Sequence, residues 1–561
     1  MKDKKIIAAT ILVMVAYFLV QISTIGARNI PETYWKPLDV ATISIDLGKK
    51  PYVKEFLVYF GYGEGKIDCQ FYRDNSLVLQ QSLQPTFFQA KNVILNAEVD
   101  KVILITNGVF EIREIAIKDE KGRVINLEDS NISLISGTKY EGELRNLVDE
   151  QSKMSQVTNY KFSSYFDEIY HARTAYEFAK GLPPYDLVHP PLGKWLISVG
   201  ICIFGGNPFG WRIINLLGGT LLIGFLILLV SKHFKFSTIE SFTLLVLIAT
   251  DFMHFTLSRI ANLDTFSLLF DILTAIFAMN YINLICEQKN ENSNTTLNYY
   301  LTFTFAGMAF ACKWNAIFPL IPLLVGVVFA FILTCYKTKA KLSKIAKRLV
   351  LSAVGFIVPY YLTYLPIIIK YPYYGLPKGL VGDFVMLQNH IWKYHSTLNA
   401  THPFSSEWYQ WLLSTKPLWA YFDVSLPSNL KSTIAMLGNP VMWGVGLLSI
   451  ALLTIMTVTS KEKEWKSWAV ILCYIFSIVP WMFIGRIRFI YHYYLAIPWL
   501  YIAIIMVLKK IKAAEKVKNK ILIGLNILTI IMFVLYYPVI SGVTVSTKYI
   551  DMLKIMKSWI F

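Results

Sequence analysis

The chain has 561 residues, of which 55% are hydrophobic and only 16% are charged. Soluble domains usually carry about 25% charged residues, and the apolar runs of this chain recur at close to the ~20 residues that cross a bilayer as a helix. This composition excludes a soluble globular protein and predicts a multi-span α-helical membrane protein. The formal net charge of +17 reflects basic loops between the apolar runs. Such loops are typical of the cytoplasmic side of a membrane, so we expect no nucleic-acid partner.

Residues 1–26 begin with MKDKK and continue with the apolar run IIAATILVMVAYFLVQIST. This run is too long for the core of a typical signal peptide, and no clear cleavage site follows it. We therefore expect a retained first transmembrane helix, with the N-terminal lysines holding that end of the chain in the cytoplasm.

Residues 27–160 are more polar and predict an extracytoplasmic β-sandwich-like domain. Segments such as VATISIDL, KEFLVYFGY, DCQFYR, NSLVLQQSL and KVILIT alternate or are rich in β-branched residues, and turn residues at Gly61, Gly63 and Asn107–Gly108 separate several of them. Short strands at this spacing are typical of a β-sandwich. The run EIREIAIKDEKGRVINLE resembles the last strands of galactose-binding-type jelly rolls, which implies a jelly-roll-like fold. Such a domain could bind the acceptor or act as a structural cap.

Residues 161–508 contain most of the apolar runs and predict the main membrane domain. The run 195–204 is too short to cross a bilayer and is expected to lie along the outer leaflet. Spans are predicted at 210–231, 238–256, 265–284, 299–314, 316–335, 349–368, 432–458, 467–484, 489–508 and, in the C-terminal segment 509–561, 521–540. With the first helix this makes about eleven crossings. Alternation of the crossings places the basic loops 337–348, 461–466 and 509–520 inside, and the loop 369–431 outside.

Two adjacent carboxylates, Asp167 and Glu168, stand in a segment that this topology places at the outer membrane surface. Neighbouring carboxylates repel, and a partly desolvated one has a raised pKa. Such a group suits a general base that removes a proton from a hydroxyl nucleophile. The alternative is a solvated acidic pair at the start of a helix.

Basic and rigid elements accompany the acidic pair. The run DLVHPPLGKW contains Asp186, His189 and Lys194, and its two prolines restrict the backbone that carries them. Further cations fall at predicted outer edges of spans, against the positive-inside pattern: Arg212, Arg259, Lys313, Arg486 and Arg488. Each alone could extend its charge to lipid headgroups. Together at one face they favour a site for an anionic lipid phosphate, which arginine and lysine bind well.

An ordered set of motifs covers most of residues 160–505. The pieces are FDEIYHARTAYEFAKG, HPPLGKWL, WRIINLLGG, SRIANLD, GMAFACKWNAIF, MLQNHIWKYHSTLNATHPFSSEWYQWLLSTKPLWAYF, GNPVMWGVGLL and RFIYHYYLAIPWL. In this order they resemble the protein O-mannosyltransferase family, whose fold is the GT-C class of membrane glycosyltransferases. The outer loop 369–431 is too short for the extra β-trefoil domain of eukaryotic members, and the β-rich insert has no counterpart in them. The chain thus looks like a bacterial-type member.

The resemblance implies transfer of a sugar, usually mannose, from a polyprenyl-phosphate carrier to Ser or Thr hydroxyls of exported proteins, with inversion at the anomeric carbon. It implies that Asp167 is the catalytic base and Glu168 its acidic neighbour, and that Arg212 is a donor-site arginine. Asp186, His189 and Lys194 would line the same outer cavity. The outer loop would contribute Gln388, His395, His402 and Trp408.

The sequence also allows expectations about metal binding, alternative functions, location and oligomeric state. No DxD motif appears in the outer loops and the six cysteines lack metal-site spacing, so we expect no metal site and no obligatory cofactor. Alternatives are a lipid-carrier-dependent transferase acting on a cell-wall polymer or glycolipid, and a lipid-linked-sugar transporter, which should show paired halves with broken helices. The expected location is the plasma membrane, with the active site outside. No feature of the sequence requires an oligomer.

Overall fold

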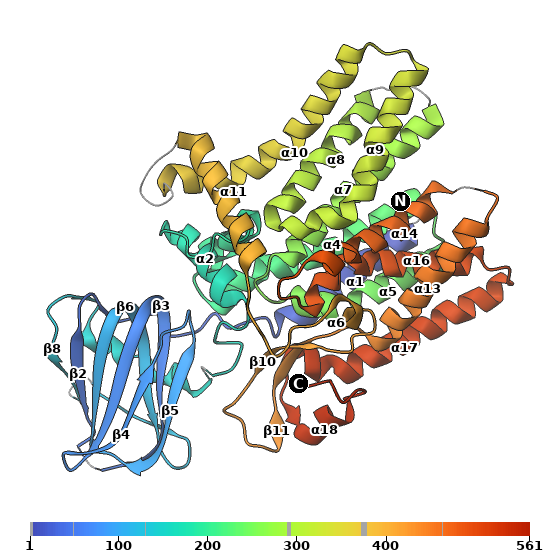
Figure 1. The fold of residues 1–561 in the computed structure, drawn as a ribbon. Coiled ribbons are helices and arrows are strands. Elements are labelled where there is room, and N and C mark those ends of the chain that lie inside the picture. Colours follow the sequence, from blue (N-terminus) through green and yellow to red (C-terminus); the bar gives the residue numbers. More distant parts are fainter. Residues whose placement is uncertain are drawn as a thin grey trace.

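The computed structural model describes residues 4–48, 50–128, 131–156, 158–288, 293–371, 379–462 and 464–561. It contains a β domain and a larger helical part, with helix α2 (Glu168–Lys180) lying between them (Figure 1). Helix α1 (Lys4–Ile22) belongs to the helical part and packs against α4 (Pro208–His233). The β domain is therefore inserted between the first helix and the rest of the helical part.

The β domain is built on one antiparallel sheet whose longest strands are β3 (Tyr52–Arg73) and β6 (Lys101–Lys118). These two strands pair along most of their length. Strands β2 (Ala41–Asp46) and β8 (Ile132–Ser136) extend the sheet beyond β6, while β4 (Ser76–Leu83) and β5 (Ala90–Glu98) pair with opposite halves of β3. The strands surround an apolar core, as a sandwich does. Short strands complete the domain: β1 (Lys36–Pro37), β7 (Val124–Ile125) and β9 (Tyr140–Glu141).

The turns predicted at Gly61–Gly63 and Asn107–Gly108 are wrong, because both positions are bends inside continuous strands. The register between β3 and β6 shifts between Tyr59 and Gly63. Gly63 and Gly108 have φ values of +121° and +119°, and a Cβ on Gly108 would lie 2.5 Å from the Cα of Gly65. Glycine at a bulge has the same local sequence as glycine in a turn. The segments KEFLVYFGY and DCQFYR consequently form the single strand β3.

Nine helical segments of the described chain are long and apolar enough to cross a membrane. They are α1, α4, α7 (Asp264–Gln288), α9 (Ile317–Lys337), α10 (Leu342–Lys370), α13 (Pro440–Thr459), α14 (Trp465–Ile478) continued by α15 (Pro480–Phe483), α16 (Ile497–Lys510) with the preceding 3-10 turn Ile490–Ala496, and α17 (Glu515–Ser541). The fold is thus a multi-span helical membrane fold.

Two of the predicted spans are not among these nine segments. The segment predicted at 238–256 is divided into α5 (Thr238–Ala249) and α6 (Phe252–Leu257), because Asp251 caps the second helix by accepting a hydrogen bond from the His254 backbone. Helix α8 (Ser293–Cys312) has 20 residues, but its first half contains several Asn and Thr residues that lower its apolar character. It packs between α7 and α10.

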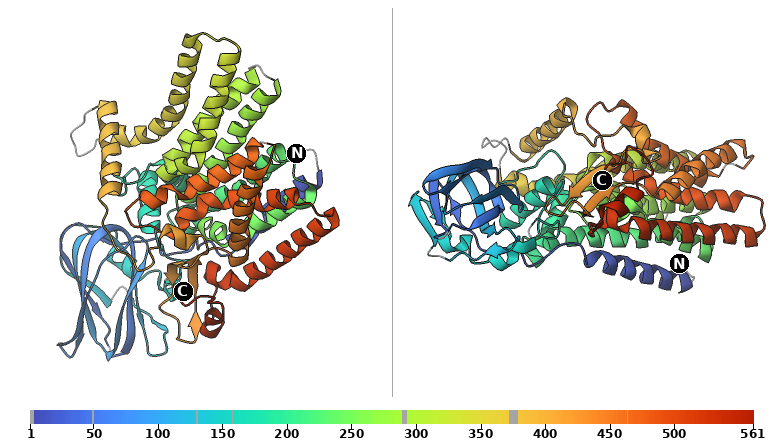
Figure 2. Two further views of the ribbon diagram at one scale, coloured as in Figure 1. Left: turned by 45° about the vertical axis from the view of Figure 1, so that its right-hand side comes forward. Right: turned by 90° about the horizontal axis from the view of Figure 1, so that it is seen from below.

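The predicted span 432–458 begins too early. Residues Thr433–Met436 form strand β12, which pairs with β10 (Leu418–Phe422), and α13 starts only after the cap at Asn439. The segment before α13 also holds α11 (Gly379–Thr397) and the short α12 (Trp408–Trp411). Strand β11 (Leu430–Lys431) pairs with β13 (Val545–Ser546), just before α18 (Thr547–Met552). The segment therefore lies beside residues 545–552 near the C-terminus, and both views of Figure 2 show this arrangement.

Helices α2 and α3 (Leu192–Phe204) connect the β domain to the helical bundle. Helix α3 has 13 residues, which at 1.5 Å per residue is about 20 Å and too short to cross a bilayer. The rings of Phe87 and Phe88, from the β domain, contact Tyr176 of α2 and Trp211 of α4, with centroids 5.4–5.8 Å apart. Because these residues share one apolar core, the β domain is packed onto the membrane part.

Candidate active site

Asp167 stands at the N-terminus of α2, where the β domain, α2 and the helical bundle meet. Its side chain makes no capping hydrogen bond to the helix, and it accepts none from any residue that the structure describes. The side chain is half-buried. The preceding residue, Phe166, has φ +50°, a left-handed conformation that bulky residues rarely adopt. Asp167 is thus a positioned carboxylate whose oxygens are free for another partner.

The charges around Asp167 come from three separate segments. Burial raises the pKa of Asp167 above its usual value, and the nearby carboxylates of Asp264 and Asp186 act in the same direction. His171 and Lys313 oppose this shift by favouring the ionised form. A carboxylate with a raised pKa is a stronger base, as proton abstraction from a hydroxyl requires.

Glu168 has a different environment from its neighbour. Its carboxylate is fully buried and binds the Arg212 guanidinium through two hydrogen bonds of 2.7 Å, and it also accepts from the Tyr165 and Ala261 backbones. The remaining Arg212 donors go to the carbonyls of residues 25, 160 and 163. All five N–H groups of Arg212 are therefore used. The prediction that Arg212 binds the donor is corrected by this geometry, because no N–H group is left for a phosphate.

Lys194 likewise has its charge matched within the protein. Its ammonium is fully buried, lies 2.8 Å from the Asp186 carboxylate and also donates to the Asp186 carbonyl. The imidazole of His171 is 3.4 Å from the same carboxylate. Burial opposes the charge of Asp186, but Lys194 and His171 outweigh it and hold the pKa of Asp186 well below its usual range. Asp186 and Lys194 thus support the wall of the site, and the prediction that Lys194 contacts the donor is corrected.

A cavity of about 780 Å³ gathers four of the predicted residues: His189, Lys313, His395 and Arg486. The His189 and His395 rings are 5.0 Å apart, and Arg486 donates to the His395 imidazole. Burial, and then the Lys313 charge, hold the pKa of His189 well below its usual range. The other walls are largely apolar and aromatic: Phe310, Trp314, Ile317, Phe318, Trp392, Trp481 and Phe483. The cavity therefore has one cationic wall and one apolar, aromatic wall. This combination suits a ligand that has an anionic headgroup and a hydrocarbon chain.

Lys313 links this cavity to Asp167. Its ammonium lies 2.9 Å from both oxygens of Asp264, which stands at the start of α7, and 4.9 Å from the centroid of the Tyr491 ring. Tyr491 lines the cavity and contacts the ring of Phe166, the residue before Asp167. The candidate base thus lies next to the wall that carries the cations.

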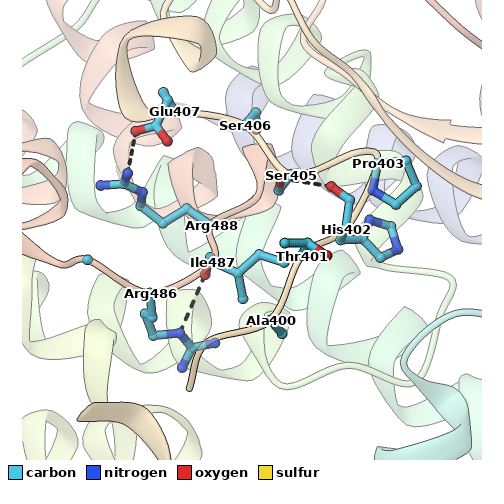
Figure 3. A pocket seen from close by; sticks show the side chains of 11 residues that line it. Ala400, Thr401, His402, Pro403, Ser405, Ser406, Glu407, Arg486, Ile487 and Arg488 are labelled. Atoms are coloured by element: carbon cyan, nitrogen blue, oxygen red, sulfur yellow. Dashed lines mark hydrogen bonds and ion pairs between the residues drawn. The ribbon is translucent and has the colours of Figure 1, made fainter. Parts of the chain in front are cut away.

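A second cavity of about 460 Å³ shares Gly485 and Arg486 with the first and is formed by residues 400–403, 405–407 and 485–488 (Figure 3). His402 lines it and accepts a hydrogen bond from the Phe404 backbone. Arg488 donates to Glu407 and to the carbonyls of residues 481 and 484. Arg488 is consequently bound on several sides, whereas the Arg486 guanidinium faces both cavities.

Three further predicted residues also lie outside the lining of both cavities. Arg259 is buried and donates to the carbonyls of Thr24 and Ser541, joining the ends of α1 and α17. Gln388 accepts a hydrogen bond of 2.5 Å from Tyr360, and Trp408 packs against the main core. The predicted donor role of Arg259 and outer-cavity roles of Gln388 and Trp408 are corrected accordingly.

The structure also identifies residues that the sequence analysis did not select. His171 lies one helical turn after Asp167, and the i, i+4 spacing alone places both on one face of α2. Asp264 belongs to the SRIANLD motif, where only the arginine was selected. Tyr491 gave no such signal, because a tyrosine in an aromatic-rich run is usually a packing residue.

The sequence of this chain is similar to those of known mannosyltransferases. Residues 188–362 match the family model of dolichyl-phosphate-mannose-protein mannosyltransferases, and residues 380–559 match that of the C-terminal four-transmembrane region of protein O-mannosyltransferases. A polyprenol-phosphate-mannose–protein mannosyltransferase of Mycolicibacterium smegmatis is 25% identical over 458 residues, covering 70% of this chain and 87% of the relative. One of Mycobacterium tuberculosis is 37% identical over 120 residues, covering 20% of this chain and 23% of the relative.

A solved structure shares the fold. The protein O-mannosyltransferase Pmt1-Pmt2 complex of S. cerevisiae, bound to its sugar donor, has a TM-score of 0.60 to this chain. The match covers 71% of this chain and 90% of that one, at 11% sequence identity. The similarity supports a GT-C membrane fold for the helical part.

Proposed function

We propose, from the premise that this chain belongs to the protein O-mannosyltransferase family, that it transfers mannose from a polyprenyl-phosphate carrier to Ser or Thr hydroxyls of exported proteins. The observation that carries the mechanism is the carboxylate of Asp167, which has no hydrogen-bond partner among the described residues, beside Lys313 and the amphiphilic cavity. The mycobacterial relatives are named for this reaction, which supports the choice of donor and acceptor.

In this proposal the donor occupies the larger cavity. Its phosphate lies against Lys313 and Arg486, with neutral His189 and His395 as hydrogen-bonding neighbours, and the first part of its lipid follows the aromatic wall. Arginine and lysine stabilise the phosphate dianion that leaves in the reaction. The acceptor reaches the sugar from the side of the smaller cavity, where His402 and Glu407 line the approach.

The reaction is a single displacement. The acceptor oxygen forms a bond to the anomeric carbon as the bond from that carbon to the phosphate oxygen breaks. The hydroxyl proton moves to Asp167, and polyprenyl phosphate leaves with the electron pair of the broken bond. One direct attack with one base inverts the configuration of the anomeric carbon, as for inverting glycosidases.

The topology that fits this proposal has eleven crossings, with the β domain and both cavities on the outer face of the plasma membrane. Helix α8 and the pair α5–α6 would complete the nine apolar segments. The basic residues at 344–348 and 509–520 then lie inside.

Purified protein in lipid vesicles, supplied with polyprenyl-phosphate mannose and a Ser/Thr-containing peptide, should yield mannosyl-peptide. Asp167→Asn should lower kcat by about 10²–10⁴-fold, since it removes the general base, while the thermal unfolding midpoint is retained. Asp551→Asn, in an exposed pair with Lys554, is the matched control and should be fully active.

Full activity of Asp167→Asn would overturn its assignment. Mannose transfer by the wild type to a cell-wall glycan or glycolipid, with none to peptide, would instead select the alternative acceptor. Movement of the intact donor across the vesicle membrane without any cleavage would point to a transporter.

We further propose that the reaction needs no divalent cation, because Lys313 and Arg486 can balance the leaving phosphate. A chelator in the vesicle assay should leave the rate unchanged. Loss of activity that Mg²⁺ or Mn²⁺ restores would contradict this. Among the described residues, the one carboxylate group arranged to hold a metal is Glu114, Asp149 and Glu150 in the β domain, and Asp167 is not part of it.

A further inference from the structure

The segment immediately before Asp167 is held by the β domain through four hydrogen bonds. The Tyr59 hydroxyl donates to the Phe162 carbonyl at 2.6 Å, and the Gln89 amide donates to the Ser164 carbonyl at 3.0 Å. The segment also donates to the β domain. The Ser164 backbone N–H donates to the Phe88 carbonyl at 3.0 Å, and the Ser164 hydroxyl donates to the Phe87 carbonyl. Phe162 and Ser164 are therefore bound by a domain that begins more than a hundred residues earlier.

The backbone at this contact has an unfavourable conformation on both sides. Phe166 has φ +50°, and Phe88, whose carbonyl accepts the Ser164 backbone bond, has φ +45°. A bulky residue in the left-handed region is energetically unfavourable, and persists only where the surroundings fix it. The hydrogen bonds from the β domain are interactions of that kind.

The other end of the segment is held by the helical bundle. Arg212 of α4 binds the Glu168 carboxylate and also the Ser163 carbonyl, so Asp167 lies between a residue held by the bundle and a segment that the β domain holds at Phe162 and Ser164. Between these anchors, the carboxylate of Asp167 has no hydrogen bond of its own to a described residue. The direction in which it points therefore depends on the conformation of residues 162–168.

We propose that Tyr59, Gln89 and Ser164 are positioning residues for Asp167, and that the β domain is a structural part of the catalytic site. The inference rests on the proposed function, since it concerns the base of that reaction. It assigns the domain a role that a freely tethered binding module would not have. The apolar core that Leu57 and Phe88 share with Ala172 and Tyr176 of α2 agrees with it.

The β domain itself provides a matched pair of double variants. Tyr59→Phe with Gln89→Met removes two of the four bonds and leaves the ring of Tyr59 in the core. Tyr72→Phe with Gln70→Met removes a tyrosine–glutamine hydrogen bond of 3.0 Å elsewhere in the same domain. Tyr72 and Tyr59 both belong to β3, but only Tyr59 reaches the catalytic segment.

The measurements are kcat, the KM for polyprenyl-phosphate mannose, the thermal unfolding midpoint and backbone hydrogen exchange over residues 162–168. We expect Tyr59→Phe/Gln89→Met to lower kcat by about 10–100-fold, because a misplacement of roughly 1 Å can cost 10²-fold. Its donor KM should stay within about twofold of wild type, since the cavity is unchanged. Backbone hydrogen exchange over residues 162–168 should become faster in this variant and not in Tyr72→Phe/Gln70→Met. The thermal unfolding midpoints of the two double variants should be similar.

Equal kcat in the two double variants would overturn the proposal, as would a loss of kcat that follows the unfolding midpoint in both. Unchanged hydrogen exchange over 162–168 would also overturn it, whatever the activity. A wild type without mannosyl transfer would instead refute the proposed function, and the exchange measurement would still decide whether the β domain orders this segment.

Discussion

Asp167 and Glu168 are chemically similar neighbours whose surroundings give them different tasks. Glu168 is completely buried, and its carboxylate accepts four hydrogen bonds, two from Arg212 and two from backbone amides. Asp167 has no such donors and is surrounded by a mixture of carboxylates and cations. The sequence predicted the pair but not this division, because the partners of Glu168 come from residues 212 and 261. Only one of the two carboxylates is therefore available for proton transfer.

The pH dependence of transfer should report the environment of Asp167. The base acts only when ionised, and burial raises its pKa, so activity should be lost on the acid side at a pH above the ordinary aspartate value of 3.8. Since His171 lowers this pKa, His171→Phe should move the acid limb of kcat/KM to higher pH. An acid limb that stays in place in this variant would contradict the electrostatic contact between the two residues.

At the scale of secondary structure elements, the positions of the helices could be predicted from the sequence. The contacts between segments far apart in the chain could not. Apolar runs located the nine apolar segments, with boundaries that differ by up to eight residues, and the short length of α3 was also evident. The strands merged where Gly63 and Gly108 form bends, which local sequence does not distinguish from turns. Of the predicted cations, Lys313 and Arg486 reach the larger cavity, whereas Arg212, Arg259 and Lys194 serve as internal ion-pair or carbonyl partners. Which cations reach a cavity depends on tertiary contacts.

The Arg212–Glu168 pair joins α4 to the start of α2, and its removal should destabilise the protein. Arg212→Met leaves a buried carboxylate without its partner, which typically costs about 3–5 kcal/mol. Arg212→Met combined with Glu168→Met removes both charges and should restore part of the lost stability. Thermal unfolding in detergent measures both, and a double variant less stable than Arg212→Met alone would argue against a buried charge as the cause.

For the whole molecule, the arrangement across the membrane follows from charge and from the place of the cavities. We expect the smaller cavity to face outward and the loop after α13 to face the cytoplasm. In a variant without the six cysteines, Thr401→Cys should react with a membrane-impermeant maleimide on intact cells. Ser460→Cys should react only after the cells are permeabilised. Both positions are exposed, so the reverse pattern would invert the proposed topology.

Arg259 has a consequence for how the protein is made. Its guanidinium binds the carbonyl of Thr24, at the end of the first helix, and that of Ser541, at the end of the last long one. During synthesis Ser541 leaves the ribosome 282 residues after Arg259. Until then a buried cation lacks part of its coordination, which is costly in an apolar interior. A chain that ends before Ser541 would thus lack the contact through which Arg259 joins the ends of α1 and α17.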